Sequence, residues 1–172
     1  MSYLNIKQSF SQIKGSNTGI ALKEKGDCMV RALAATADIS YNMSHRFCKK
    51  FFDRKDNTGT NNAMILVTML KAQEESLNIF GRKYDVTILG KSDLTNRYKV
   101  NGEIIYRKKT LKSFIESHPK GSFIVEVAGH ALSVKDGELM DWNTLKFKPT
   151  RKVLGAYKLE RKHLGTQLSL FK

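Results

Sequence analysis

The chain has 172 residues, 41% of them hydrophobic, and carries 30 Lys and Arg against 16 Asp and Glu, for a net charge of +14. This length and composition fit one globular domain with a core and exclude a disordered chain, while the charge favours anionic partners. Two cysteines give no disulfide framework, the N-terminus lacks the apolar core of a signal peptide, and no apolar run approaches the about 18 residues of a membrane span, so we expect a cytoplasmic protein with no membrane partner.

The first half of the chain has the apolar spacing of helices. Residues 1–20 are polar and mixed in character, and we expect them to form an N-terminal extension. A helix is predicted over 27–38, with Asp27 as its N-cap, because a carboxylate accepts hydrogen bonds from the free amides of a first turn. A second helix is predicted over 41–52, behind the N-cap Ser40.

A third helix is predicted over 63–77, after a polar loop at 57–62. Its predicted buried face consists of apolar residues at helical spacing, namely Met64, Leu66, Val67, Leu70 and Leu77. The loop is interpreted as the edge of a cleft or as a plain connection, because it lacks the lysine of a phosphate-binding loop.

In the second half the apolar period changes to that of strands. A strand is predicted over 84–89, and Asn101-Gly102 predicts a hairpin turn because both turn positions tolerate positive φ. Thr110 is predicted to cap a short helix. Four more strands are predicted at 122–127, 131–134, 138–141 and 152–159. Helices first and an antiparallel sheet second predict an α+β fold with two lobes and a cleft between them.

Cys28 is the residue that best predicts a function. It lies at the start of the first predicted helix, where free amides and the helix dipole favour a negative charge, so its pKa is expected to be lowered. The Cys28 backbone N–H is a candidate oxyanion donor. The charge of Asp27 works against thiolate formation, and Arg31, one turn further on, can neutralise it.

A histidine and a carboxylate complete the pattern. His130 lies in the alternating segment 125–134, and Asp141 follows a predicted turn at Asp136-Gly137. We expect His130 to deprotonate the Cys28 thiol and then to protonate a leaving group, while Asp141 fixes the imidazole tautomer. Trp142 is expected to shield that hydrogen bond from water. A lone buried cysteine is most often a core residue, so the prediction depends on the combination.

Two further groups of residues invite a functional interpretation. His45 and Cys48 are three residues apart and could face one metal ion, but no second pair of ligands is visible, so neither a metal site nor a cofactor is predicted. The basic clusters predict either a solvated surface or a polyanion-binding surface, without the motif of a known nucleic-acid module. The candidate polyanion-binding residues are Arg107, Lys108, Lys109, Lys112, Arg151, Lys152, Arg161 and Lys162.

The segments Gly26-Asp27-Cys28-Met29-Val30-Arg31-Ala32-Leu33 and Gly129-His130-Ala131-Leu132-Ser133-Val134 resemble the nucleophile helix and histidine strand of papain-like cysteine proteases, including C39-like peptidases. They are most similar to small, uncharacterised bacteriophage proteins with an Asp-Cys-x-x-Arg-Ala-Leu helix and a Gly-His-Ala strand. The resemblance, over roughly residues 22–142, implies a papain-like fold and a Cys28-His130-Asp141 triad, and we expect the papain-like domain to span 21–164. The last residues, 165–172, are expected to form a loose C-terminal tail. The oxyanion-binding Gln usual in this superfamily is missing from 21–25, and Gln12 and Asn17 are the remaining candidates.

These observations leave more than one function open. The first is a phage-encoded cysteine hydrolase that cleaves an amide or isopeptide bond of a peptide or protein substrate in the host cytoplasm. The alternative is a basic binding protein on the same scaffold, which docks an acidic host protein or nucleic acid and has little or no catalysis. Transglutaminase-like or deamidase chemistry with the same three residues is a third interpretation.

Overall fold

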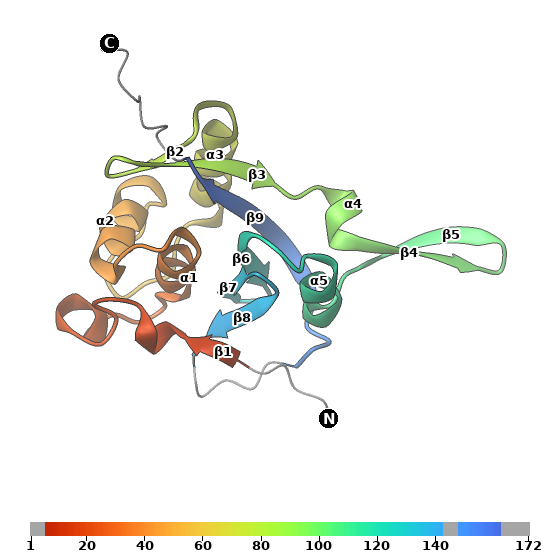
Figure 1. The fold of residues 1–172 in the computed structure, drawn as a ribbon, viewed down its shortest axis with the longest axis horizontal. Coiled ribbons are helices and arrows are strands. Elements are labelled where there is room, and N and C mark those ends of the chain that lie inside the picture. Colours follow the sequence, from red (N-terminus) through yellow and green to blue (C-terminus); the bar gives the residue numbers. More distant parts are fainter. Residues whose placement is uncertain (1–5, 143–147, 163–172) are drawn as a thin grey trace, which may run out of the picture.

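The computed structural model describes residues 6–142 and 148–162, which form an α+β fold (Figure 1). The helices are α1 (Cys28–Ala37), α2 (Tyr41–Phe51), α3 (Asn62–Glu75), α4 (Lys91–Leu94) and α5 (Leu111–Ser117), with 3-10 helices η1 (Phe10–Gln12) and η2 (Gly19–Leu22). The strands are β1 (Ile6–Ser9), β2 (Leu77–Ile79), β3 (Arg82–Ile88), β4 (Thr95–Val100), β5 (Glu103–Lys108), β6 (Ser122–Val127), β7 (His130–Lys135), β8 (Glu138–Asp141) and β9 (Val153–Arg161). The α+β prediction is therefore confirmed.

Seven strands form the main sheet, in the order β1-β8-β7-β6-β9-β3-β2. Every neighbouring pair is antiparallel except β1 and β8, which run parallel. Strand β1 comes from the segment predicted as an N-terminal extension, and it lies at the edge of the sheet beside the strand that carries Asp141. The predicted tail at 165–172 lies outside the described residues.

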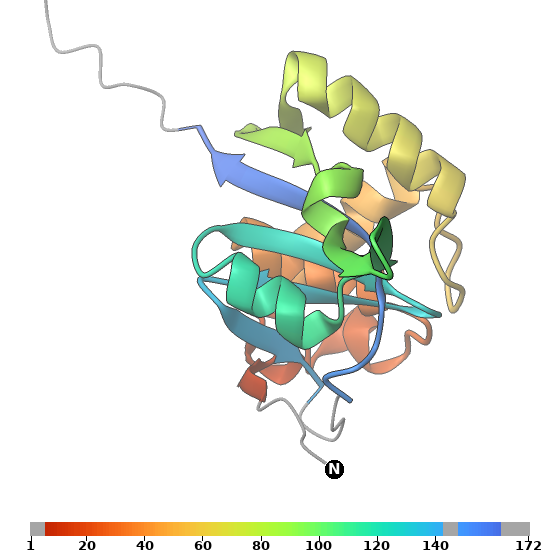
Figure 2. The same cartoon turned by 90° about the vertical axis from the view of Figure 1, so that its right-hand side faces the viewer.

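The sheet has helices on both faces (Figures 1 and 2). Helix α5 packs on one face, in a core cluster that includes Leu111 and Phe114 together with alternate residues of β6 and β7. Helices α1, α2 and α3 contribute to the other cluster. Helix α1 is buried along almost its whole length, and its alanines allow it to lie close to the strands.

A polar contact fixes α1 on the centre of the sheet. The Thr36 hydroxyl donates to the Phe123 carbonyl at 3.1 Å, and it lies 2.8 Å from the Ser133 hydroxyl. Thr36 and Ser133 are both buried. These hydrogen bonds satisfy groups that would otherwise be costly to bury, and they connect α1 to the two strands β6 and β7.

The predicted buried face of the third helix is wrong. Helix α3 buries Ile65, Met69 and Ala72, which lie at i, i+4 and i+7 on one stripe against β2 and β3. Met64, Leu66, Val67 and Leu70, which the prediction placed in the core, are exposed. The helix carries apolar residues all around its axis, so spacing alone does not select the face that packs.

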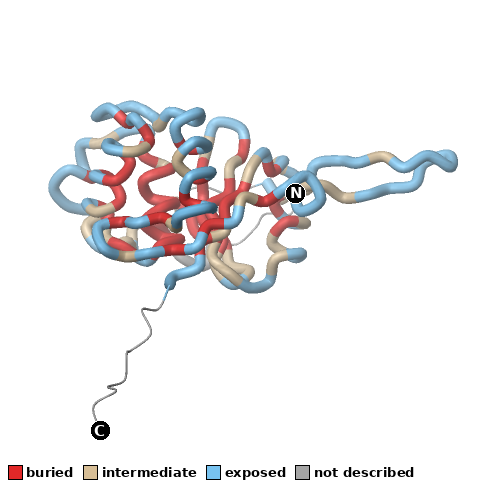
Figure 3. Tube along the Cα trace, turned by 90° about the horizontal axis from the view of Figure 1, so that it is seen from above, coloured by how far each residue is buried: buried red, intermediate tan, exposed pale blue. Residues whose placement is uncertain are grey.

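The predicted hairpin is confirmed and is longer than expected. Strands β4 and β5 pair over six residues each, and Asn101 and Gly102 form the turn with φ of 50° and 86°. The hairpin is a separate two-stranded ribbon that projects from the body of the molecule (Figures 1 and 3). Among the described helices, none has the length and apolar character to cross a membrane.

The contact between α1 and the sheet can be tested by Thr36→Val, which keeps the shape of the side chain and removes its hydroxyl. We expect the free energy of unfolding to fall by about 1–2 kcal/mol, because the buried Ser133 hydroxyl and Phe123 carbonyl lose a partner. Urea denaturation measures the change. The matched control Thr87→Val lies at an exposed position of β3 and should leave stability nearly unchanged; equal effects of the two substitutions would contradict the interpretation.

Candidate active site

Three elements bring the predicted triad together. Cys28 is the first residue of α1, His130 the first residue of β7 and Asp141 the last residue of β8. The alternating segment 125–134 spans parts of two strands, as predicted, and His130 belongs to the second of them. Ala128 and Gly129 form a tight turn between β6 and β7, with Gly129 at φ 69°, and His130 follows this turn.

The imidazole of His130 is held by a buried carboxylate. Its Nε2 lies 2.9 Å and 3.1 Å from the two oxygens of Asp141, whose side chain is fully buried. Because a carboxylate only accepts, Nε2 carries a proton, and Nδ1 is left on the side of the thiol. The backbone N–H of Trp142 also donates to Asp141, at 2.8 Å, and fixes the orientation of its carboxylate.

The thiol of Cys28 is half-buried, and its surroundings favour the thiolate. Burial of the thiol raises its pKa, but a hydrogen bond with the His130 side chain and bonds from the backbone N–H groups of Ala131 and Met29 lower it. The balance places the pKa of Cys28 below its ordinary value of 9.0. The sequence predicted this direction, although the bond from Ala131 was not foreseen.

His130 shifts in the complementary direction. Burial lowers the pKa of its imidazole, but the hydrogen bonds with Asp141 and Cys28 and the negative charges of these two groups raise it, to about 9. A lowered thiol pKa beside a raised imidazole pKa favours the thiolate–imidazolium pair over the neutral pair. The three side chains therefore form an activated thiol with a protonated partner.

Asp27 holds the N-cap position of α1, as predicted, but the capping hydrogen bond expected of its carboxylate is not made. The carboxylate instead accepts hydrogen bonds from Arg31 Nε at 2.8 Å and from the Tyr41 hydroxyl at 2.9 Å. The predicted neutralisation of Asp27 by Arg31 is present, and the amides at the start of α1 remain free of a side-chain cap near the thiol.

Arg31 and Trp142 pack against each other between the elements that carry Cys28 and Asp141. The guanidinium of Arg31 lies 4.0 Å from the centre of the Trp142 ring, a cation–π contact, and it also donates to the Ser16 and Ala21 carbonyls. The Trp142 ring meets Phe10 edge-on at 5.9 Å. Trp142 thus packs between η1 and α1 and ties the end of β8 to the helix that carries the thiol.

A cavity of about 380 Å³ opens beside the thiol. Cys28 and His130 line it together with the loop predicted as a cleft edge or a plain connection, through Gly59, Thr60 and Asn62. A Cβ at Gly26 would lie 3.2 Å from the Gly59 nitrogen, so glycine before Asp27 lets this loop approach the start of α1.

Sequence reasoning missed Glu126 and Leu154, which also line the cavity. Glu126 is half-buried, and burial raises the pKa of its carboxyl. In the part of the chain that the structure describes, this carboxyl makes no hydrogen bond or ion pair. The sequence signal that could have identified Glu126 is an acidic residue among the buried apolar residues of β6. Leu154 lies on β9, far from the motifs in sequence, and nothing local marks it.

Neither candidate oxyanion residue of the N-terminal segment reaches the thiol. The Gln12 side chain accepts from the Ser9 backbone N–H, and Gln12 lines a different cavity, of about 450 Å³. The Asn17 amide donates to the Ser11 carbonyl at 2.8 Å. The side-chain donors around the thiol cavity are instead those of Thr60 and Asn62.

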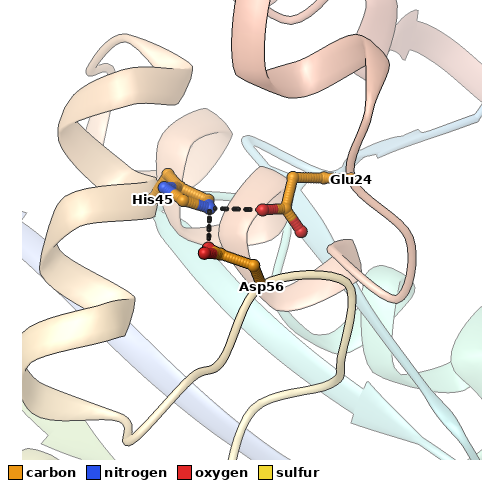
Figure 4. Close-up of side chains that lie close together, drawn as sticks. All are labelled: Glu24, His45 and Asp56. Atoms are coloured by element: carbon orange, nitrogen blue, oxygen red, sulfur yellow. Dashed lines mark hydrogen bonds and ion pairs between the residues drawn. The ribbon is translucent and has the colours of Figure 1, made fainter.

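A second polar cluster lies beside the loop of the cavity. A ring nitrogen of His45 and one carboxylate oxygen each of Glu24 and Asp56, the atoms that could ligate a metal ion, lie within 4.8 Å of one another (Figure 4). His45 Nε2 donates to Glu24 at 2.9 Å, and Glu24 also accepts from Arg54 at 2.8 Å and from the Asn57 backbone N–H at 2.8 Å. The guanidinium of Arg54 already neutralises Glu24, so we assign the cluster a structural role, which is to hold the loop that begins at Asn57.

His45 and Cys48 do not face one metal ion, because their side chains lie in different surroundings. His45 bonds to Glu24, whereas Cys48 is fully buried in the core. Burial raises the pKa of the Cys48 thiol to about 12. Cys48 is therefore a packing residue, as the sequence analysis favours for a lone buried cysteine.

The structure divides the predicted polyanion-binding residues into two groups. One group surrounds the base of the β4–β5 hairpin, where Thr110 bridges to Lys152 and the Val153 N–H donates to the Lys109 carbonyl. Its members are Arg107, Lys108, Lys109, Lys112, Arg151 and Lys152. Arg161 and Lys162 lie at the opposite end of β9, where Lys162 forms an ion pair with Asp85 at 2.8 Å.

Comparison of the chain with family models, with curated proteins and with solved structures finds no match in any of the three. The interpretation of the site therefore depends on its own geometry.

The ionisation of Cys28 predicts its reactivity toward iodoacetamide. A free cysteine loses about tenfold in rate for each pH unit below its pKa, because only the thiolate reacts. Since the pKa of Cys28 is lowered, its rate should fall less than this between pH 8 and pH 6. Mass spectrometry of the modified peptides gives the rates. Buried Cys48 is the internal control, and equal, slow labelling of both thiols would contradict the prediction.

The buried Glu24 charge predicts a stability effect. Glu24→Gln leaves fully buried Arg54 without its counter-charge, so we expect the free energy of unfolding at pH 7 to fall by about 3 kcal/mol, measured by urea denaturation. Burial raises the pKa of Glu24, but its contacts with Asn57, Arg54 and His45 lower it overall. The stabilisation is therefore present above the ordinary pKa of 4.5 and is lost as pH falls through the lowered pKa.

Two comparisons sharpen this test. The difference between Glu24→Gln and the parent protein should shrink in acid. Asp56→Asn, at the exposed member of the cluster, should have little effect on stability. A Glu24→Gln protein as stable as the parent at pH 7 would show that the buried pair contributes nothing.

Proposed function

We propose that the chain is a cysteine hydrolase of papain-like architecture. The observation that supports this most strongly is the position of His130, which bonds to buried Asp141 on one side and to half-buried Cys28 on the other, at the wall of a cavity. Acyl transfer through a covalent intermediate requires a nucleophile that is hydrogen-bonded to a base, and a third group that orients the base. The two cysteines are free, which suits the reducing cytoplasm that we propose as its compartment.

In the proposed reaction the Cys28 thiolate attacks the carbonyl carbon of an amide or isopeptide bond. A carbon–sulfur bond forms, the carbon–nitrogen bond breaks, and the amine leaves with the proton that His130 gives to it. Water then attacks the thioester while His130 takes a proton from it. The carbon–sulfur bond breaks, the carboxylic acid departs, and Cys28 is again a thiolate beside the protonated His130. Asp141 holds the His130 tautomer in both steps.

The developing oxyanion needs donors near the sulfur. The backbone N–H of Cys28 at the start of α1 is one candidate, and the Asp27 side chain caps no amide of this turn. The Asn62 amide and the Thr60 hydroxyl line the same cavity and are the proposed side-chain donors. They replace the glutamine that the resemblance implies.

The proposed substrate is a peptide or protein chain. The cavity beside Cys28 combines apolar walls at Met29, Val127 and Leu154 with the Glu126 carboxyl. A donor group of a bound peptide would satisfy this carboxyl, which has no partner in the described part of the chain. The deamidase and transglutaminase interpretations begin with attack of the same thiolate on a side-chain carboxamide, which releases ammonia. Water resolves the thioester in a deamidase, and an amine resolves it in a transglutaminase.

A chromogenic ester tests the proposed acyl transfer. With p-nitrophenyl acetate we expect a burst of p-nitrophenolate that corresponds to acetylation of Cys28, because acylation precedes hydrolysis of the thioester. His130→Ala should slow the burst by at least about a hundredfold, since it removes the base. Stopped-flow absorbance and intact mass measure the two quantities.

The matched control for this experiment is the other cysteine. Cys28→Ala should abolish the burst, whereas Cys48→Ala should retain it in every preparation that circular dichroism shows to be folded. A burst that survives Cys28→Ala, or that is insensitive to His130→Ala, would refute the proposed mechanism.

A further inference from the structure

The β4–β5 hairpin carries none of the residues of the proposed hydrolase site. Among the described strands, β4 and β5 pair only with each other, and they lie outside the main sheet (Figures 1 and 3). Isolated two-stranded ribbons have little stability of their own in water. Large apolar side chains exposed on them mark an interaction site or promote aggregation. Tyr98, Val100, Ile104 and Tyr106 are nevertheless 44–56% exposed on this ribbon.

Cations lie on both faces of the ribbon, with Arg97, Lys99 and Lys108 on one face and Arg107 on the other, which also carries Glu103. Residues that pair across an antiparallel ladder share a face, and the register joins Arg97 to Tyr106 and Lys99 to Ile104 on one face. The other face carries Tyr98 and Arg107, whose guanidinium lies 5.7 Å from the Tyr98 ring centre.

The charge of the ribbon has one sign along nearly its whole length. Its cations are Arg97, Lys99, Arg107 and Lys108, and Glu103 beside the turn is its single acid. The base continues this charge, because Lys152 reaches to within 3.5 Å of the Lys108 carbonyl. Arg97 and Lys99 make no ion pair in the described part of the chain and were not foreseen as binding residues.

We propose that this ribbon is a nucleic-acid-binding arm that lies in a groove of a duplex. A two-stranded β-ribbon fits the major groove, which is about 12 Å wide. A groove presents phosphates along both of its edges, where they can meet Arg97, Lys99 and Lys108 on one face of the ribbon and Arg107 on the other. A flat protein partner would cover one face and leave the aromatic and basic side chains of the other in water. This arm goes beyond the proposed hydrolase and does not depend on Cys28.

The test uses a fluorescein-labelled DNA duplex of about 20 base pairs, with anisotropy measured between about 50 and 200 mM salt. The double substitution Arg97→Ala with Lys99→Ala should weaken binding by at least about tenfold and reduce the slope of log affinity against log salt by about two. Tyr106→Ala should weaken binding and leave that slope unchanged, because it removes no charge.

The matched control removes the same charge elsewhere. Lys71→Ala with Lys83→Ala removes two exposed cations on α3 and β3, outside the ribbon, and should change the affinity by less than about threefold. Each variant is compared with the parent by thermal denaturation. Cys28→Ala should bind as the parent does, so failure of the hydrolase and failure of the arm are separable.

Three results would overturn the proposal. One is the absence of duplex binding at the lowest salt. Another is an equal loss of affinity in the two double variants, which would show that net charge alone drives the association. The third is competition by polyglutamate as strong as that by unlabelled duplex at equal charge, which would indicate an acidic protein as the partner.

Discussion

Arg31 lies almost wholly buried where the N-terminal segment, α1, α2 and the end of β8 meet. Its guanidinium bonds to Asp27 on its own helix and stacks on Trp142, the residue that follows Asp141. One side chain thus connects the turn that carries Cys28 to the strand that carries Asp141. Because a buried guanidinium without its partners is costly, neither element can shift alone. The distance between thiol and carboxylate depends on this packing.

A similar arrangement holds the other side of the cleft. Arg54 is buried against Glu24, which also binds the backbone of Asn57 and so fixes the loop that faces the thiol. The segment from Glu24 to Arg31 is therefore fastened at both ends by a buried ion pair, with Cys28 between them. Arginine is rarely buried unless it is paired, and both guanidiniums are paired here, so they give Cys28 a rigid support.

The sequence was sufficient to predict features that local chemistry decides. Ser40 and Thr110 cap their helices, and Asn101-Gly102 turns the hairpin, because each of these residue types acts on its own neighbours. The Asp27 carboxylate does not cap α1 because it accepts instead from Arg31, one turn further on, and from the Tyr41 hydroxyl of α2. The predicted face of α3 is wrong for a related reason, since apolar residues surround that helix and only the position of β2 and β3 selects the buried stripe.

Edge strand β1 has a consequence for the other end of the sheet. Its residues run parallel to β8, and Ser9 stands opposite Asp141 in the register. Without β1, the strand that carries the carboxylate would become an open edge, with unpaired backbone groups ready to recruit a foreign strand. Truncation before η1, far from Cys28 in sequence, would therefore expose β8 to self-association and loosen the carboxylate that orients the imidazole.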